Sequence, residues 1–210
     1  MQQKVCFWLV LFINSFTSAF SQVQSPEQFL GYRIGDRFTP HFRIVEYFRH
    51  VATASPSTMK LEQYGETYQG RPLIAAFISS ASNISSLETI RNNNMALATG
   101  NRSAYAGTAP ALVWLSYNVH GNETSSSEAA MMSLFSLVDP ANARRKPWLQ
   151  NTVVIIDPCL NPDGRDRYVN WFNSIVGAKP NPLLIAREHN EPWPGGRTNH
   201  YNFDLNRDWA

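Results

Sequence analysis

Cysteine is scarce in this chain of 210 residues, which contains only two. Cys6 lies in an N-terminal segment that we expect to be removed, so Cys159 would be the single thiol of the processed protein. An internal disulfide is therefore excluded, and the fold must be held together by its apolar core. We expect Cys159 to be a small packing residue and not a reactive thiol.

The chain also lacks a long run of charge of one sign. Its net charge is +2, and its densest basic cluster, Arg144-Arg145-Lys146, is only a short stretch beside Pro147. Such a cluster is typical of a solvated turn and is too short to follow a phosphate backbone, so we expect no nucleic-acid partner. With 43% apolar and 16% charged residues, the composition is that of one ordinary folded domain.

No stretch after residue 21 is long and apolar enough to cross a bilayer, so we expect no membrane association of the processed chain. Residues 1–21 combine Lys4, an apolar run over 5–13 and the small residues Ala19 and Ser21 at the positions that a signal peptidase reads. This order is typical of a secretory signal peptide, and a buried N-terminal strand is the alternative. We therefore expect a secreted or periplasmic protein; its oligomeric state is not indicated.

The apolar pattern predicts alternating strands and helices. Residues 22–58 are interpreted as an aromatic-rich, aperiodic arm and a helix that is capped by Thr39 and ended by Ser55-Pro56. Further on, we expect strands over 61–64, 73–78, 111–117 and 152–156, helices over 85–98 and 125–138, and a polar loop over 100–107. The last two strands are continuous apolar runs, which predicts burial on both faces. The fold class is therefore α/β, with a mixed, largely parallel sheet flanked by helices.

Residues with metal-binding chemistry follow the strand over 111–117. His120 and Glu123 lie three residues apart with Gly121 between them, so a tight turn can aim an imidazole and a carboxylate at one point. Both groups are good zinc ligands, and ligands gather beyond the carboxyl ends of strands in open α/β sheets. Alone, the pattern is weak, because Glu123 could be a first-turn helix acid and His120 an ordinary polar residue at a strand end.

A second cluster of polar residues lies near the C-terminal end. Arg197, Asn206 and Arg207 occur within a short span that also contains Asp204. The planar guanidinium binds a carboxylate through two hydrogen bonds, and an asparagine adds a neutral donor. The span therefore suits a ligand with a free carboxylate, although a surface patch of ion pairs is the commoner fate of such residues.

Four motifs together resemble the zinc metallocarboxypeptidases, the group that includes carboxypeptidases A, B, D and E. In chain order they are Gly70-Arg71-Pro72-Leu73, His120-Gly121-Asn122-Glu123, Asn161-Pro162-Asp163-Gly164, and Gly196-Arg197 followed by Asp204-Leu205-Asn206-Arg207. The spacing from Arg197 to Asn206 (206 − 197 = 9) agrees with the D and E branch. The resemblance covers 61–209 and implies that 59–210 form the N-terminal part of a carboxypeptidase-like catalytic domain.

The resemblance also implies a role for each residue. His120 and Glu123 would hold one zinc ion, and Asp204 would accept a hydrogen bond from the imidazole of His120. Arg197 would stabilise the oxyanion of the scissile carbonyl, while Asn206 and Arg207 would bind the C-terminal carboxylate of a peptide or protein substrate. Asn161 to Gly164 are expected to shape the cleft as a turn. The implied reaction is hydrolysis of the last peptide bond by a metal-activated water.

The resemblance stops before the family's third zinc ligand, a histidine, and its general-base glutamate. A catalytic zinc site needs three protein ligands and an open position, and neither His189 nor His200 matches the third. We therefore expect a truncated chain that is inactive by itself. Two alternatives remain. Aspartoacylase-like zinc amide hydrolases share the His-Gly-Asn-Glu and Asp-Leu-Asn-Arg pairing, and a non-catalytic secreted binding domain could retain the fold and the carboxylate clamp.

Overall fold

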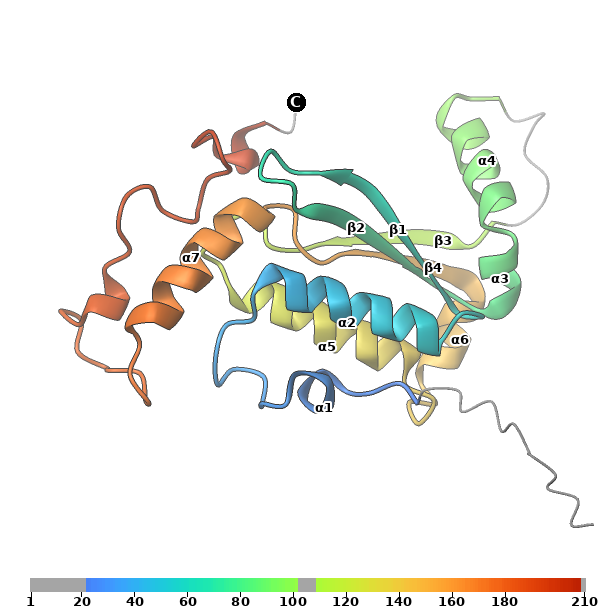
Figure 1. Ribbon diagram of the computed structural model, residues 1–210. Coiled ribbons are helices and arrows are strands. Elements are labelled where there is room, and N and C mark those ends of the chain that lie inside the picture. Colours follow the sequence, from blue (N-terminus) through green and yellow to red (C-terminus); the bar gives the residue numbers. More distant parts are fainter. Residues whose placement is uncertain (1–21, 102–108, 209–210) are drawn as a thin grey trace, which may run out of the picture.

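The computed structural model describes residues 22–101 and 109–208, so the predicted signal peptide and most of the predicted loop over 100–107 lie outside the described residues. Helices stand before, between and after the strands along the chain (Figure 1). Their order is α1 (Pro26–Leu30), α2 (His41–Ala54), β1 (Met59–Glu66), β2 (Pro72–Ile78), α3 (Ala81–Ser85), α4 (Leu87–Ala98), β3 (Ala111–Ser116), α5 (Ser125–Val138), α6 (Arg145–Asn151), β4 (Thr152–Asp157), α7 (Pro162–Ile175), η2 (Arg187–His189) and η3 (Leu205–Arg207). No described helix is long and apolar enough to cross a membrane.

The four strands form one mixed sheet in the order β1-β2-β4-β3. β1 and β2 are antiparallel neighbours, β2 and β4 are also antiparallel, and β3 runs parallel to β4. The predicted mixed α/β sheet is thus confirmed. Among the described strands, one pairing is parallel, between β3 and β4, and two are antiparallel. Because these two strands are parallel, the segments that follow them leave the sheet at the same edge.

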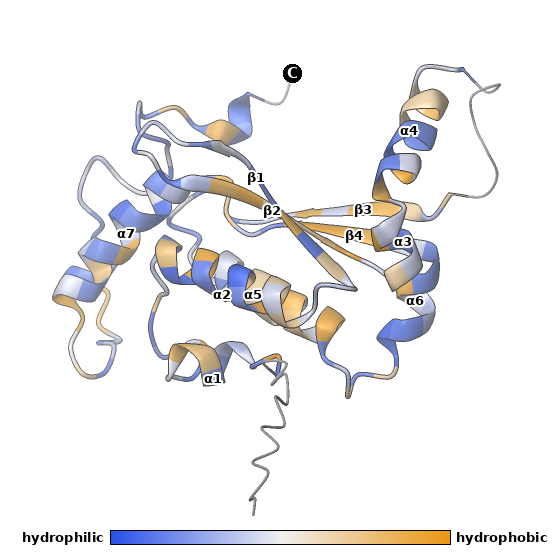
Figure 2. Ribbon diagram, turned by 45° about the vertical axis from the view of Figure 1, so that its right-hand side comes forward, coloured by the Kyte–Doolittle hydropathy of each residue, from blue (hydrophilic) through white to orange (hydrophobic). Residues whose placement is uncertain are grey.

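Helices α2 and α5 cover one face of this sheet (Figure 1). Figure 2 shows apolar residues in orange along the strands above these two helices. The buried cluster contains Ile44, Phe48 and Val51 of α2, Met131 and Leu134 of α5, Ile74, Ala76 and Ile78 of β2, and Val154 and Ile156 of β4. The cluster residues of β2 and β4 alternate along each strand, so they mark the face that packs on α2 and α5.

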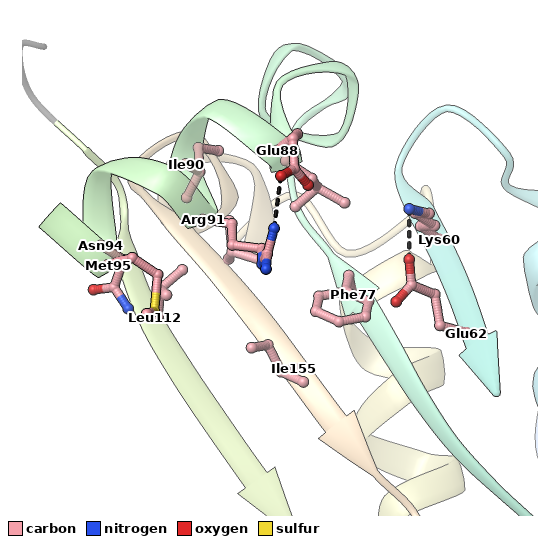
Figure 3. Close-up of a pocket in the computed structure, with 12 residues that line it drawn as sticks. Lys60, Glu62, Phe77, Glu88, Ile90, Arg91, Asn94, Met95, Leu112 and Ile155 are labelled. Carbon is pink, nitrogen blue, oxygen red and sulfur yellow. Dashed lines mark hydrogen bonds and ion pairs between the residues drawn. The ribbon is translucent and has the colours of Figure 1, made fainter. Parts of the chain in front are cut away.

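The opposite face is more open, and here one expectation is wrong. β3 was predicted to be buried on both faces, yet Leu112, Val113 and Trp114 are 39%, 41% and 66% exposed. β3 is an edge strand of the described sheet, so no described strand pairs with its outer side. At one end of this face, α4 and the strands enclose a cavity of about 410 Å³ whose floor includes Phe77 and Ile155 (Figure 3). No predicted site residue lines that cavity.

Several local predictions are also corrected. The aperiodic arm contains the short helix α1, which Ser25 caps by accepting a hydrogen bond from Gln28. Helix α2 begins at His41 with Pro40 as its N-cap, so the expected Thr39 hydroxyl cap is wrong. The basic cluster that was interpreted as a solvated turn leads into helix α6. The segment Asn161 to Gly164 is not a free turn: Asn161 caps α7, and Pro162 occupies its first position, where a missing N–H costs nothing.

The burial of His41 predicts that the fold is sensitive to acid. Its side chain is 2% exposed, and its ring Nε2 lies 2.9 Å from the carbonyl oxygen of Pro72. Burial lowers the pKa of His41 below its ordinary value, so the folded chain favours the neutral ring. A lowered histidine pKa means that its contribution to stability is present above about pH 6.5 and is lost as the pH falls toward the folded pKa.

We therefore expect the free energy of unfolding to fall between pH 7 and pH 5 more steeply in the wild type than in the His41→Gln variant. The difference in slope has a limit of about 1.4 kcal/mol per pH unit, the value for one proton. Glutamine keeps a donor for the Pro72 carbonyl but does not titrate. Urea unfolding at pH 5, 6 and 7 measures the two slopes, and equal slopes would contradict this role of His41.

Candidate active site

The turn after β3 brings the two predicted metal ligands together. The backbone N–H of Glu123 donates to the carbonyl of His120 at 3.1 Å, which closes the turn just before α5. His120 Nδ1 lies 2.9 Å from Glu123 Oε1. The His120 side chain is 6% exposed and the Glu123 side chain 57%, so the imidazole is fixed in the protein while the carboxylate faces outward. The two side chains therefore converge, as the spacing of the motif predicts.

Asp204 orients the imidazole from the other side, although it lies far away in the sequence. Its Oδ1 is 3.0 Å from His120 Nε2. If Nε2–H donates to this carboxylate, the tautomer is fixed and Nδ1 presents its lone pair to Glu123. A lone pair and a carboxylate at 2.9 Å repel each other unless a proton or a metal ion lies between them. The arrangement therefore suits a cation.

Arg197 completes the contacts around Asp204. Its Nε and Nη2 each lie 3.0 Å from Asp204 Oδ2, and its Nη1 is 3.4 Å from His120 Nδ1. Partial desolvation alone would raise the pKa of Asp204, but the N–H of Asn206 together with His120 and Arg197 holds this pKa below its ordinary value. Asp204 is therefore a charged acceptor that His120 and Arg197 share.

The donor set fits part of a zinc site. An imidazole nitrogen and a carboxylate oxygen are ligand types that zinc prefers, and an imidazole that is hydrogen-bonded to a carboxylate is typical of zinc-bound histidine. Within residues 22–101 and 109–208, no group of three or more His, Cys, Asp or Glu side chains could hold a metal. The described chain thus brings together two candidate ligands.

Three glycines fix how the site segments meet. A Cβ atom on Gly121 would lie 2.1 Å from the backbone N of Arg165 and 2.5 Å from the carbonyl oxygen of Gly196. A Cβ on Gly164 would lie 2.3 Å from that same oxygen. Such distances are far below ordinary contact, so the turn at 120–123, the start of α7 and the segment before Arg197 touch backbone to backbone. We name the contact of Gly121, Gly164 and Gly196 the glycine junction.

Two further residues connect these segments, in a role that the sequence did not predict. Asn161 Nδ2 donates to the carbonyl of Arg197 at 3.2 Å, while its Oδ1 caps α7 through the N–H of Gly164 at 2.9 Å. Glu191 Oε2 accepts from Asn122 Nδ2 at 2.9 Å, and its Oε1 accepts the N–H of Gly196. Glu191 is an isolated acid in a loop, so no local pattern in the sequence could have revealed it.

Of the remaining predicted residues, Asn206 and Arg207 lie beside Asp204, whereas the other histidines contact groups outside the site. Asn206 and Arg207 belong to η3, directly after Asp204, and both are exposed. His200 contacts Gln69 and His189 contacts the carbonyl of Asn181, so neither histidine joins His120 and Glu123. Cys159 is buried and a free thiol. Burial raises the pKa of the Cys159 thiol to about 12, consistent with a packing role.

Comparisons with known proteins identify the family and the fold of the chain. A family model described as zinc carboxypeptidase matches residues 44–210. A putative carboxypeptidase A from Shewanella denitrificans OS-217 has a TM-score of 0.51 and 19% identity over 82% of this chain and 32% of that chain. A metallo-carboxypeptidase from Burkholderia cenocepacia has a TM-score of 0.50 and 16% identity over 82% of this chain and 33% of its own.

Thrombin activatable fibrinolysis inhibitor is similar at a TM-score of 0.50 and 14% identity, with 71% of this chain and 30% of that chain covered. At these identities the structures show a shared fold. The chain spans about a third of the length of the solved structures that it matches.

The glycine junction predicts a specific loss of stability. In the Gly164→Ala variant the new methyl group would meet two backbone carbonyls and the Asn161 amide at 2.3–2.6 Å. We expect a loss of about 1–3 kcal/mol or more, because backbone must move to admit it. Helix propensity alone predicts a gain in stability instead, because alanine is more favourable than glycine inside a helix.

Gly177→Ala is the matched control, because its nearest contact would be an ordinary 3.5 Å. Urea unfolding of both variants measures the two changes. If Gly164→Ala were no less stable than Gly177→Ala, the close contact at the glycine junction would be wrong.

Proposed function

Because the chain belongs to the zinc carboxypeptidase family, we propose that it supplies the first part of the active site of a zinc-dependent exopeptidase, which removes the C-terminal residue of peptides. The observation that carries this proposal is the convergence of His120 Nδ1 and Glu123 Oε1 at 2.9 Å while Nε2 is engaged by Asp204. Since the chain spans about a third of the matched structures, the activity is proposed for the whole protein. We also propose that the protein is exported, because residues 1–21 have the pattern of a secretory signal peptide.

His120 and Glu123 would hold the ion, and Asp204 would keep the Nε2 proton on His120. A bound zinc ion would polarise the scissile carbonyl and lower the pKa of a water toward neutrality. In the family, the third zinc ligand and the general base come from later segments, for which these 210 residues have no counterpart. We propose that the whole protein provides both.

Arg197 would stabilise the negative charge that develops on the carbonyl oxygen. Its side chain is 43% exposed and already lies beside His120 Nδ1, so it can reach a group bound at the cation position. Asn206 and Arg207 would recognise the free carboxylate at the end of the substrate, since a guanidinium and an amide offer several donors to one carboxylate. The same recognition would limit cleavage to the last residue.

The metal proposal predicts a zinc response centred on the turn. We expect Zn²⁺ to shift the backbone amide resonances of residues 120–123 in the 210-residue chain, with weak affinity because two ligands are present. His120→Ala and Glu123→Gln should weaken that affinity at least about tenfold, since loss of even an outer partner of a zinc ligand costs as much. His200→Ala is the matched control and should bind zinc as the wild type does. Unchanged affinity in His120→Ala would refute the assignment.

The substrate proposal predicts discrimination between two otherwise identical peptides. With zinc present, a peptide with a free C-terminal carboxylate should bind more tightly than its C-terminal amide. Arg207→Gln should weaken binding of the free acid about tenfold or more, the value expected for hydrogen bonds to a charged group, and leave the amide unaffected.

Arg187→Gln removes a guanidinium from η2 and serves as the control. Calorimetric titration of both peptides measures the difference. Equal affinities for acid and amide would contradict the clamp, and a preference for N-acetyl-aspartate over peptides would support the amide hydrolase alternative.

A further inference from the structure

A buried arginine lies directly behind the candidate metal-binding turn. Arg165 follows Gly164 in the first turns of α7, and its side chain is 0% exposed. A buried guanidinium is costly unless it is paired and all its N–H groups find acceptors. The contacts of Arg165 therefore indicate what the chain gains from placing a charge there.

Every N–H of this guanidinium has an acceptor. Nε and Nη2 donate to the carbonyl of Thr39 at 3.0 and 2.7 Å, and Nη2 also donates to Glu128 Oε1 at 2.7 Å. Nη1 donates to the carbonyl of Thr124 at 2.7 Å and to Asn118 Oδ1 at 3.2 Å. These five hydrogen bonds match the five donors of an arginine, a number that lysine cannot supply.

Two of the acceptors belong to the segment that carries the candidate ligands. Thr124 directly follows Glu123. Asn118 is a non-glycine residue with a positive φ of 56°, and its Nδ2 donates to the carbonyl of His120 at 2.6 Å and to that of Glu123 at 3.2 Å. One amide side chain thus links the guanidinium to the backbone of both candidate ligands.

Glu128 explains why a charge can be held at this position. It lies one turn into α5, its side chain is 6% exposed, and its Oε1 also accepts the N–H of Thr39 at 2.7 Å. The pair Arg165 and Glu128 therefore joins α7 to α5 and to Thr39, in the segment before α2. Because the first helical residues of α5 and α7 are tied together in this way, the turn that leads into α5 has little freedom to move relative to α7.

We propose that Arg165 is a positioning residue of the metal site: through Thr124 and Asn118 it holds His120 and Glu123 at the separation that a cation needs. Its relation to a metal rests on the proposed function, whereas its hold on the turn does not. The guanidinium is too deeply buried to touch a substrate, so it acts through the backbone of the turn.

The proposal is tested first without metal, by amide hydrogen exchange in the 210-residue chain. Arg165→Lys keeps the positive charge but loses the planar set of five N–H donors. Amide exchange in residues 118–124 should therefore accelerate at least about tenfold more than exchange in β4. This is the effect expected when hydrogen bonds to a charged group are lost. Leu134→Ala, in the core face of α5, is the control: it lowers global stability and should not single out the turn.

Asn118→Gly keeps the proposal falsifiable if Arg165→Lys does not fold. Glycine accepts the positive φ, so the backbone can remain in place while the link from Arg165 to His120 and Glu123 is lost. This variant should also show faster exchange confined to the turn. If the turn and β4 changed by the same factor in every variant that folds, Arg165 would be an ordinary core ion pair and the proposal would be overturned.

A Zn²⁺ competition titration with a fluorescent chelator then tests the relation to the metal. We expect about 10–100-fold weaker zinc binding in Arg165→Lys and Asn118→Gly, and little change in Leu134→Ala. Faster exchange with unchanged zinc affinity would overturn the role of Arg165 toward the metal. If the wild type itself did not bind zinc at the turn, the proposed function would fail, while the exchange result would still decide whether Arg165 holds the turn.

Discussion

The site depends on one constraint: three chain segments meet at the glycine junction with no side chain between them. Gly121, Gly164 and Gly196 approach so closely that a single Cβ at Gly121 or Gly164 would lie 2.1–2.6 Å from neighbouring backbone. This contact places the turn of His120 against the start of α7 and against the segment that leads to Arg197. The hydrogen bond between His120 and Asp204 can form only because these segments are held side by side.

Charge is distributed around that junction on two sides. On the open side, Arg197 and His120 share the carboxylate of Asp204, so this side can respond to a ligand. On the buried side, Arg165 pairs with Glu128 and donates a hydrogen bond to the backbone carbonyl of Thr124, next to the candidate metal ligand Glu123. One guanidinium is thus part-exposed beside His120, and the other is buried behind the turn that carries His120 and Glu123. Their side chains are 43% and 0% exposed, which suits the contact with a bound group that we propose for Arg197 and the positioning role that we propose for Arg165.

Local sequence patterns predicted the helices and strands that are determined by their own residues. Helix α5 was predicted over 125–138, and β2 was predicted almost completely as a short apolar run that follows a Gly- and Pro-containing turn. Helix α7 was missed, because Asn161-Pro162 was interpreted as a turn although the same residues form an N-cap and a first helical position. The burial of β3 was overestimated, since an apolar run does not say whether its neighbours are present. The burial of Arg165 is a tertiary property that no short pattern encodes.

The central claim is that His120 uses Nδ1 for a metal because Asp204 holds the proton on Nε2. Long-range ¹H–¹⁵N correlation spectra of the imidazole of His120, recorded before and after saturation with Zn²⁺, test it most directly. The account predicts that zinc shifts the Nδ1 resonance to that of an unprotonated, metal-bound nitrogen while Nε2 retains its proton. A proton that stays on Nδ1, with both resonances unchanged by zinc, would contradict it.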